Sequence, residues 1–253
     1  MGRDWLSGVG AAVAVLKQGL VQVLYPGTCL LCRRSLVPKE RDFCGMCHSA
    51  LASDSRLVCP RCAASVGPFT ALANGCSICR DEPFSFERVL RLGAYEGLLR
   101  EAVLRMKHFT GEAVAEALAE LWAETASQKL HETGASLIVP VPLFWRRRWV
   151  RGYNQSESLA RALAKQLRLP SGSHLLRRTR NTPSQTQQSA SKRRENVRGA
   201  FTAKPGPELT GKTVLLVDDV MTTGSTANEA AKALRRAGAA GVVVAVLAIS
   251  QKY

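Results

Sequence analysis

The sequence predicts an α/β fold with a central parallel sheet flanked by helices, preceded by a smaller cysteine-rich module. All of the cysteines are confined to one early segment. Farther along, the apolar runs Val214–Val217 and Val242–Ile249 enclose a helical pattern over Ala227–Ala237. This is the strand, helix, strand order of a parallel sheet. A chain of 253 residues has room for one full domain and one small module.

The first 25 residues are predicted to form an amphipathic helix. Apolar side chains recur every three or four positions until Pro26-Gly27 ends the pattern. The short apolar run Val9–Leu16 does not predict a signal peptide, because Asp4 precedes it and Lys17 interrupts it. No run reaches the roughly 18 apolar residues of a membrane span, so we expect no membrane-spanning segment.

The cysteines form four Cys-x-x-Cys pairs, separated by 11, 11 and 13 residues. Two residues between thiolates let one turn place both sulfur atoms on a single ion, and two such turns complete a four-sulfur shell. The pattern therefore predicts two structural zinc ions, held by Cys29, Cys32, Cys44, Cys47, Cys59, Cys62, Cys76 and Cys79.

The pairing of these cysteines stays open from spacing alone. We favour the first pair with the second and the third with the fourth, although a cross-braced arrangement fits the spacing equally well. Redox-active dithiols seldom occur in four evenly spaced copies, and disulfides are disfavoured without an export signal. His48 adjoins Cys47, but four thiolates already complete each shell.

A second domain is expected to begin after the cysteines. Val89–Tyr95 is predicted to be a strand, and Leu98–Lys107 and Glu112–Lys129 are predicted to be helices. Within this domain, the stretch after Val217 carries the clearest chemistry. Asp218 and Asp219 come first, and the loop that follows lies before a helix, where free N–H groups attract phosphate.

The loop adds hydroxyl donors and one flexible residue to that helix terminus: Thr222, Thr223, Gly224, Ser225 and Thr226. The neighbouring carboxylates offer acceptors for two adjacent sugar hydroxyls, so one sugar phosphate satisfies both halves of the motif. A metal site or a helix cap would explain the two acids but not four hydroxyl residues around a glycine.

This stretch resembles the 5-phosphoribosyl-1-pyrophosphate motif of type I phosphoribosyltransferases. The resemblance implies that Asp218 and Asp219 hold the ribose 2- and 3-hydroxyls and that the loop from Thr222 to Thr226 binds the 5-phosphate. It also implies magnesium, held mainly by oxygen atoms of the ligand. Members that act on 6-oxopurines have an acid in the position of Thr222, so this chain is not expected to use that acceptor.

Positive charge is concentrated in one stretch. The net charge is +15, and 14 basic residues against two acidic ones lie between Pro140 and Ala200. Such a field favours anionic partners, including phosphorylated small molecules and nucleic acid, over a face that is only solvated.

The predicted strand Ile138–Pro142 leads into a loop rich in arginine and tryptophan, followed by a helix capped by Ser156. This loop should open onto the same sheet edge as the phosphate loop. Its candidates for binding pyrophosphate or nucleic acid are Arg148, Arg151, Asn154 and Gln155. Interleaved aromatic and arginine residues also suit single-stranded nucleic acid, and a half-buried amphipathic segment is the alternative.

The polar stretch Arg177–Arg198 is predicted to be a long loop that folds as a basic lid over pyrophosphate, with Arg193 and Arg194 as contacts. Three features in order now resemble the ComF family. They are the four cysteine pairs, the strand leading to Arg151-Gly152-Tyr153-Asn154-Gln155, and the motif Val217–Thr226. The resemblance covers nearly the whole chain.

Membership of this family implies a cytoplasmic protein with a type I phosphoribosyltransferase fold. The implied organisation is a helix at 1–25, a double zinc ribbon at 26–82 and a phosphoribosyltransferase-like domain at 83–253. In naturally competent bacteria the family handles incoming single-stranded DNA, which implies protein partners in the competence machinery. The resemblance leaves open whether the chain only binds its ligands or transfers phosphoribose to an unidentified nitrogen acceptor. No catalytic residue is assigned.

Overall fold

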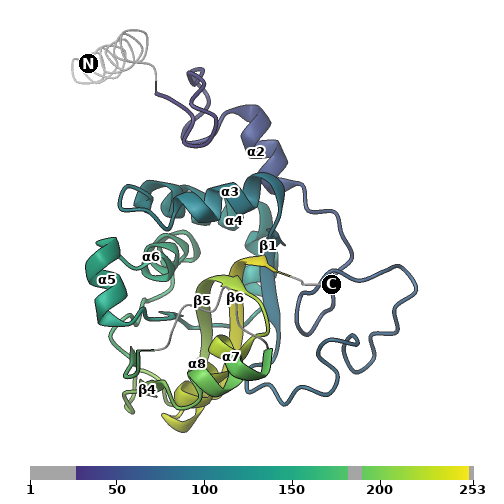
Figure 1. The fold of residues 1–253 in the computed structure, drawn as a ribbon, viewed down its shortest axis with the longest axis vertical. Coiled ribbons are helices and arrows are strands. Elements are labelled where there is room, and N and C mark those ends of the chain that lie inside the picture. The colour runs from purple at the N-terminus through teal and green to yellow at the C-terminus, as the bar shows by residue number, and fades with distance from the viewer. Residues whose placement is uncertain (1–26, 182–189, 251–253) are drawn as a thin grey trace, which may run out of the picture. The chain divides into compact units, whose positions relative to one another are not determined.

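The structure is a computed structural model that describes residues 27–181 and 190–250, without the side chains of 190–193. The predicted helix at 1–25 lies outside the described residues. The chain divides into two compact units, residues 1–50 and 51–253 (Figure 1). The two cysteine clusters fall in different units.

The core of the larger unit is a parallel sheet with the strand order β1-β6-β5-β2. Its strands are β2 (Leu137–Pro140), β5 (Thr213–Met221), β6 (Gly241–Ile249) and β1 (Val89–Ala94). Every residue of β6 is buried, as expected for a strand with a neighbour on each side and helices on both faces. The predicted α/β fold with a central parallel sheet is confirmed.

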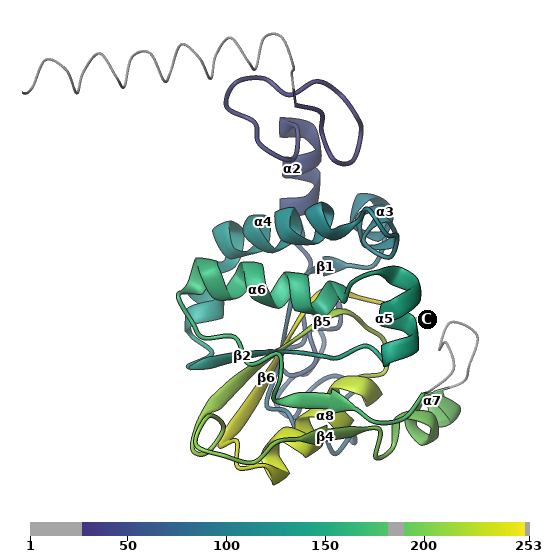
Figure 2. The same cartoon turned by 90° about the vertical axis from the view of Figure 1, so that its left-hand side faces the viewer.

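Helices cover both faces of this sheet (Figure 2). One face carries α3 (Gly97–Arg105), α4 (Glu112–His131) and α6 (Gln155–Leu167). The other face carries α8 (Ser225–Arg236), which packs against the antiparallel pair β3 (Leu176–Arg178) and β4 (Phe201–Ala203). Helix α7 (Ala190–Val197) contacts α8.

Strand β5 is longer than the sequence predicts. Its pairing with β6 continues past Val217 through Asp218↔Val246 to Met221↔Ile249. The two acids therefore belong to the strand instead of following it. Helix α8 in turn begins at Ser225, so the connection between strand and helix is confined to residues 222–224.

The segment after β2 also differs from the prediction. Residues 145–151 form helix α5 (Trp145–Arg151), which ends where Gly152 adopts a φ of 83° and donates its N–H to Arg148. The N-cap of helix α6 is Asn154, two residues before the predicted cap Ser156. Ser156 does not act as the cap because its hydroxyl binds a carboxylate of β5.

The segment expected to be one long loop, Arg177–Arg198, contains regular structure at both ends. Strand β3 pairs with β4 at its start, and α7 lies at its end. Residues 182–189 lie outside the described part of the chain, so the predicted lid remains a prediction.

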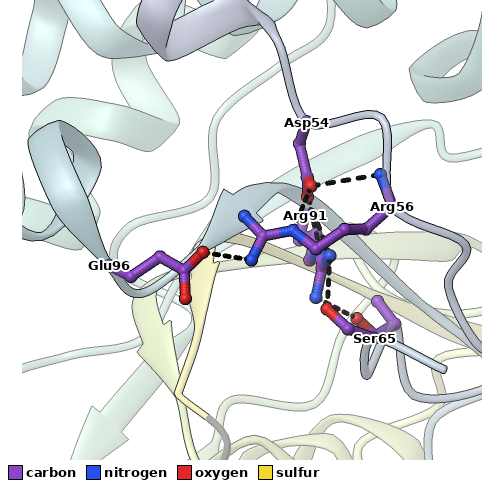
Figure 3. A network of polar contacts seen from close by, with 6 residues as sticks. Asp54, Arg56, Ser65, Arg91 and Glu96 are labelled. Atoms are coloured by element: carbon purple, nitrogen blue, oxygen red, sulfur yellow. Dashed lines mark hydrogen bonds and ion pairs between the residues drawn. The ribbon is translucent and has the colours of Figure 1, made fainter. Parts of the chain in front are cut away.

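The second cysteine-rich segment is fixed to strand β1 by a buried arginine (Figure 3). Arg91 donates to Asp54 Oδ2 at 2.8 Å, to Ser65 Oγ at 2.9 Å and to the Ala63 carbonyl oxygen at 2.9 Å. Burial opposes ionisation of Asp54, but Arg56 and Arg91 outweigh it and lower its pKa. Because its partners are charged or lie in the ribbon backbone, Arg91 ties this segment to the sheet.

Candidate functional site

The eight cysteines form two tetrads, each built from two consecutive pairs. In each tetrad the four sulfur atoms lie within 4.8 Å of one another: Cys29, Cys32, Cys44 and Cys47 in one, and Cys59, Cys62, Cys76 and Cys79 in the other. The sulfur atoms of Cys32 and Cys44, of Cys59 and Cys79, and of Cys62 and Cys76 are 3.6 Å apart. A tetrahedral ion with bonds of about 2.3 Å requires sulfur separations of about 3.8 Å. Both tetrads fit zinc, and the sequential pairing is the one observed.

Both tetrads begin with the same backbone turn. Cys29 N–H donates to Arg34 and Arg33 N–H donates back to Cys29, while Cys59, Ala63 and Ala64 repeat the same pair of bonds. Arg33 and Ala63 both adopt positive φ, 65° and 55°, although neither is glycine. The turn directs two thiols and the amides between them toward one point, the arrangement that stabilises thiolates.

These turns alter the acidity of the first thiol in each tetrad. Burial raises the pKa of Cys29 and of Cys59, but hydrogen bonds from nearby backbone groups outweigh it and lower the values to about 6 and about 7. Burial and neighbouring thiols raise the pKa of Cys47. A divalent cation would stabilise all four thiolates together, which the protein groups alone do not.

Asp218 and Asp219 lie near the carboxyl end of β5 and point to different partners. Ser156 donates its hydroxyl to Asp218 Oδ1 at 2.8 Å. Lys107 Nζ lies 3.2 Å from Asp219 Oδ2. Burial and the neighbouring Asp219 raise the pKa of Asp218 to about 7, and the Ser156 bond only partly offsets them. Asp218 is therefore an acid that gains a proton near neutral pH.

The loop after β5 leaves the first turn of α8 open. Gly224 is the N-cap with a φ of 75°, and no side chain within the described residues caps the helix. Thr223 Oγ1 and Ser225 Oγ lie 2.8 Å apart, while Thr222 is exposed and Thr226 is half-buried. The loop thus presents hydroxyl groups beside uncapped amide donors, which is the chemistry of a phosphate site.

Arginine side chains gather around the two acids together with Lys107. Burial lowers the pKa of Arg151, while the field of Asp219 raises it and that of Arg147 lowers it. Burial and Arg147 likewise lower the pKa of Arg178, against the field of Asp218. Because arginine stays charged even when its pKa is lowered, the site holds a cluster of cations next to two carboxyl groups.

The remaining predicted contacts are divided between surface and interior. Arg148 is exposed and pairs with Glu157 at 3.2 Å, and Arg194 pairs with Glu82 at 2.6 Å. Asn154 and Gln155 are buried at 5% and 1% exposure. Asn154 donates to the Val141 carbonyl oxygen, so it ties the start of α6 to the residue that follows β2. The side chain of Arg193 lies outside the described part.

Two family models match the chain. The phosphoribosyl transferase domain model matches residues 154–252, and the double zinc ribbon domain model matches residues 20–82. DNA utilization protein YhgH of Escherichia coli (strain K12) is 35% identical over 87% of this chain and 95% of that protein. Competence protein F of Haemophilus influenzae is 32% identical over 83% of this chain and 91% of that protein. The chain belongs to the ComF family.

Among solved structures, this ComF-family chain is similar to glutamine phosphoribosylpyrophosphate amidotransferase from B. subtilis. The identity is 26%, the TM-score is 0.38, and the match covers 56% of this chain. It covers 30% of that longer chain, so the ComF-family chain spans under a third of its length. Within the described residues, every helix is too short or too polar to traverse a bilayer.

Sequence reasoning missed three members of this ComF-family site. Lys107 and Arg178 lie 111 and 40 residues before Asp218 in the chain, and no local pattern links them to it. Ser156 was assigned to a helix cap. The parallel pairing of β2 with β5, Pro140↔Val217, places the end of β2 beside the phosphate loop. That strand order, which local sequence does not encode, brings the site together.

Proposed function

We propose that this protein binds 5-phosphoribosyl-1-pyrophosphate with magnesium at the carboxyl end of β5. One observation carries the proposal: the two acids near the end of β5 and the hydroxyl-lined N-terminus of α8 flank one short connection and have cations beside them. A phosphorylated ribose has the matching groups, with vicinal hydroxyls at one end and a dianion at the other. The phosphoribosyl transferase domain match supports the same ligand class.

In this proposal, the ligand lies along the connection between β5 and α8. Asp218 and Asp219 accept hydrogen bonds from the ribose hydroxyls. The 5-phosphate is bound by the loop, through Thr222, Thr223, Gly224, Ser225 and Thr226. Magnesium would neutralise charge on the pyrophosphate, held mainly by ligand oxygens, as this ion prefers.

The cations at the site are available for the pyrophosphate. Lys107 is half-buried beside Asp219, and Arg151 lies in the field of the same carboxylate. Each would form charge-assisted hydrogen bonds with phosphate oxygens. Arg193 and Arg194, predicted to act from the segment after β3, remain candidates for the same role.

We further propose that single-stranded DNA binds along α5. This helix presents two exposed tryptophans next to arginines, with Trp145 at 63% and Trp149 at 84% exposure. Arg146 Cζ lies 6.0 Å from the centroid of the Trp145 ring. Buried aromatic side chains would support the alternative of a half-buried amphipathic segment, but these two face solvent. Rings that stack on bases and guanidinium groups that bind phosphates suit a strand without base pairing.

The names of two relatives, DNA utilization protein and competence protein, support a role in the use or uptake of DNA. On that basis we propose that the protein handles single-stranded DNA in the cytoplasm, with protein partners from the competence machinery where the organism has one. The basic stretch between Pro140 and Ala200 favours association with a polyanion.

Transfer of phosphoribose to a nitrogen acceptor is the second candidate function. Lys107 and Arg151 lie near Asp219, from where they would stabilise the negative charge that develops on the pyrophosphate as it departs. A nitrogen nucleophile would form its bond at the anomeric carbon while the bond to pyrophosphate breaks. Pyrophosphate release on adding a candidate base would support this function, and release no faster than hydrolysis would oppose it.

Calorimetric titration with phosphoribosyl pyrophosphate and magnesium, with and without an oligonucleotide, tests the proposal. We expect saturable binding of the sugar pyrophosphate at one site per chain. We also expect oligonucleotide binding that weakens as salt is added, because each neutralised phosphate releases counterions. Absence of sugar-pyrophosphate binding to metal-replete protein would overturn the first part of the proposal, and absence of oligonucleotide binding the second.

A further inference from the structure

The short segment Pro83–Phe86 connects the second cysteine tetrad with the phosphate loop, and both lie in the larger unit. Phe84 packs against the apolar cluster that contains Cys59, Cys62, Cys76 and Cys79, and it also packs against the main core of the sheet. The side chain therefore contacts the residues around the metal site and the residues below the ligand site.

The Phe84 ring lies against the glycine that caps α8. A Cβ atom added to Gly224 would lie 3.2 Å from Phe84 Cε1, a separation tighter than ordinary van der Waals contact. Gly224 has a φ of 75°, so the ring lies against the loop residue that adopts the left-handed conformation. Movement of the ring would therefore displace that backbone.

A hydrogen bond from a backbone N–H to a side-chain oxygen fixes the same segment to the first turn of α8. Ser85 N–H donates to Asn228 Oδ1 at 2.7 Å, and Asn228 N–H donates to the Gly224 carbonyl oxygen at 2.8 Å. The amides expected to bind phosphate are thus bracketed by a ring contact at Gly224 and a side-chain bond at Asn228.

The other end of the link comes from inside the second tetrad. Arg61, which lies between Cys59 and Cys62, is centred 5.5 Å from the Phe84 ring. Its guanidinium group donates to the carbonyl oxygens of Cys79 and, at 2.6 Å, Glu82. Phe84 is therefore in contact with a residue that lies between two cysteines of the second tetrad.

We infer that Phe84 is a positioning residue through which the second tetrad, once metal is bound, sets the geometry of the phosphate loop. Affinity for the phosphoribosyl ligand then depends on metal at Cys59, Cys62, Cys76 and Cys79. This inference rests on the proposed function, because it assigns phosphate binding to the loop. Metal at the second tetrad thus affects ligand binding as well as stabilising the zinc ribbon.

The test compares Phe84→Leu with Phe69→Leu, the same substitution at a ring that is 99% exposed. We expect Phe84→Leu to weaken phosphoribosyl pyrophosphate binding about five-fold, the effect of losing one preorganised contact, with zinc content unchanged. Phe69→Leu should bind like the wild type. Amide hydrogen exchange should rise at residues 222–228 in Phe84→Leu, while β6 stays protected.

Two further variants keep the inference testable if Phe84→Leu does not fold. Asn228→Ala removes the acceptor of the Ser85 N–H. It should also weaken phosphoribosyl pyrophosphate binding and raise exchange at residues 222–228, both by less than Phe84→Leu does. Cys62→Ser should lower the zinc content by one ion and raise exchange at residues 222–228. Unchanged affinity and unchanged local exchange in a folded Phe84→Leu or Asn228→Ala protein would overturn the inference.

The exchange measurement separates this inference from the proposed function. If the wild type does not bind the sugar pyrophosphate, the proposed function fails, yet local exchange at residues 222–228 still reports whether Phe84 positions the loop. If the wild type binds and the variants bind equally well with unchanged exchange, only the inference fails.

Discussion

Lys107 Nζ lies 3.2 Å from Asp219 Oδ2, so a lysine just beyond α3 is paired with an acid near the end of β5. The ion pair connects the segment just after α3 with the candidate ribose site. It places one positive charge beside two carboxyl groups, one of which, Asp218, already titrates near neutral pH.

Removing this charge should weaken ligand binding. We expect Lys107→Met to reduce affinity for phosphoribosyl pyrophosphate about ten-fold, since a hydrogen bond to a charged group contributes about 1.5–3 kcal/mol. Lys165→Met, at an exposed position of α6, is the matched control and should leave affinity unchanged. Equal affinities of the two variants in calorimetry would contradict a role for Lys107.

Neutralising both acids should abolish binding without unfolding the chain. Asp218→Asn with Asp219→Asn keeps the size of both side chains, but amides accept hydrogen bonds from ribose hydroxyls less strongly. We expect at least about a hundred-fold loss of affinity, with the far-ultraviolet circular dichroism spectrum retained. Unchanged calorimetric affinity would refute the assignment of the ribose site.

The raised pKa of Asp218 predicts how stability depends on pH. The folded protein keeps this proton up to about pH 7, whereas the unfolded chain loses it near its ordinary value of about 4. Stability contributed by this group is therefore present below about pH 4 and is lost as pH rises through 7.

Asp218→Asn removes this titration. The variant should become progressively more stable than the wild type between about pH 4 and 7, by at most about 4 kcal/mol, and the difference should level off above that range. Denaturant unfolding at several pH values measures it. A difference that does not vary with pH would show that Asp218 titrates normally.

The exposed tryptophans of α5 should matter for DNA and not for the sugar pyrophosphate. We expect Trp145→Ala with Trp149→Ala to weaken single-stranded DNA binding at least about ten-fold, because stacking contributes about 1–3 kcal/mol per base. Phe69→Ala, at another exposed ring, should have no effect. Fluorescence anisotropy with a labelled oligonucleotide at two salt concentrations measures the affinity of each variant. An unchanged DNA affinity of the double tryptophan variant would rule out α5 as the DNA surface.

Metal analysis should find two zinc ions per chain. Both tetrads have the sulfur separations of a tetrahedral site. Metal binding requires thiolates, so acidification should protonate them and release the ions. Elemental analysis of protein purified under reducing conditions measures the stoichiometry. Reduced protein free of zinc would overturn both sites.

The sequence was most informative where a local pattern decides the structure. Cysteine spacing predicted two four-sulfur sites, because two residues between thiolates leave little choice of local geometry. It left the pairing open, and the structure shows consecutive pairs together. The buried strands were predicted by their apolar runs, which only a sheet covered on both faces requires.

Local sequence patterns did not predict the features of the structure that depend on long-range contacts. Asp218 and Asp219 were placed after the strand because acids are rare in strands, yet pairing with β6 keeps them in the ladder. Helix α5 has no buried residue, so no apolar stripe identified it. The partners Lys107 and Ser156 reach the acids only through the strand order.

The continued pairing of β5 with β6 gives a buried strand influence over ligand recognition. Asp218 lies opposite Val246, and Val220 opposite Ala248, both fully buried. A larger side chain in place of Ala248 would push on β5, and the backbone of β5 would carry that shift to the carboxylates of Asp218 and Asp219. Natural variation in β6 would thus change ligand affinity without touching the ligand, and a mutational survey limited to the loop would overlook it.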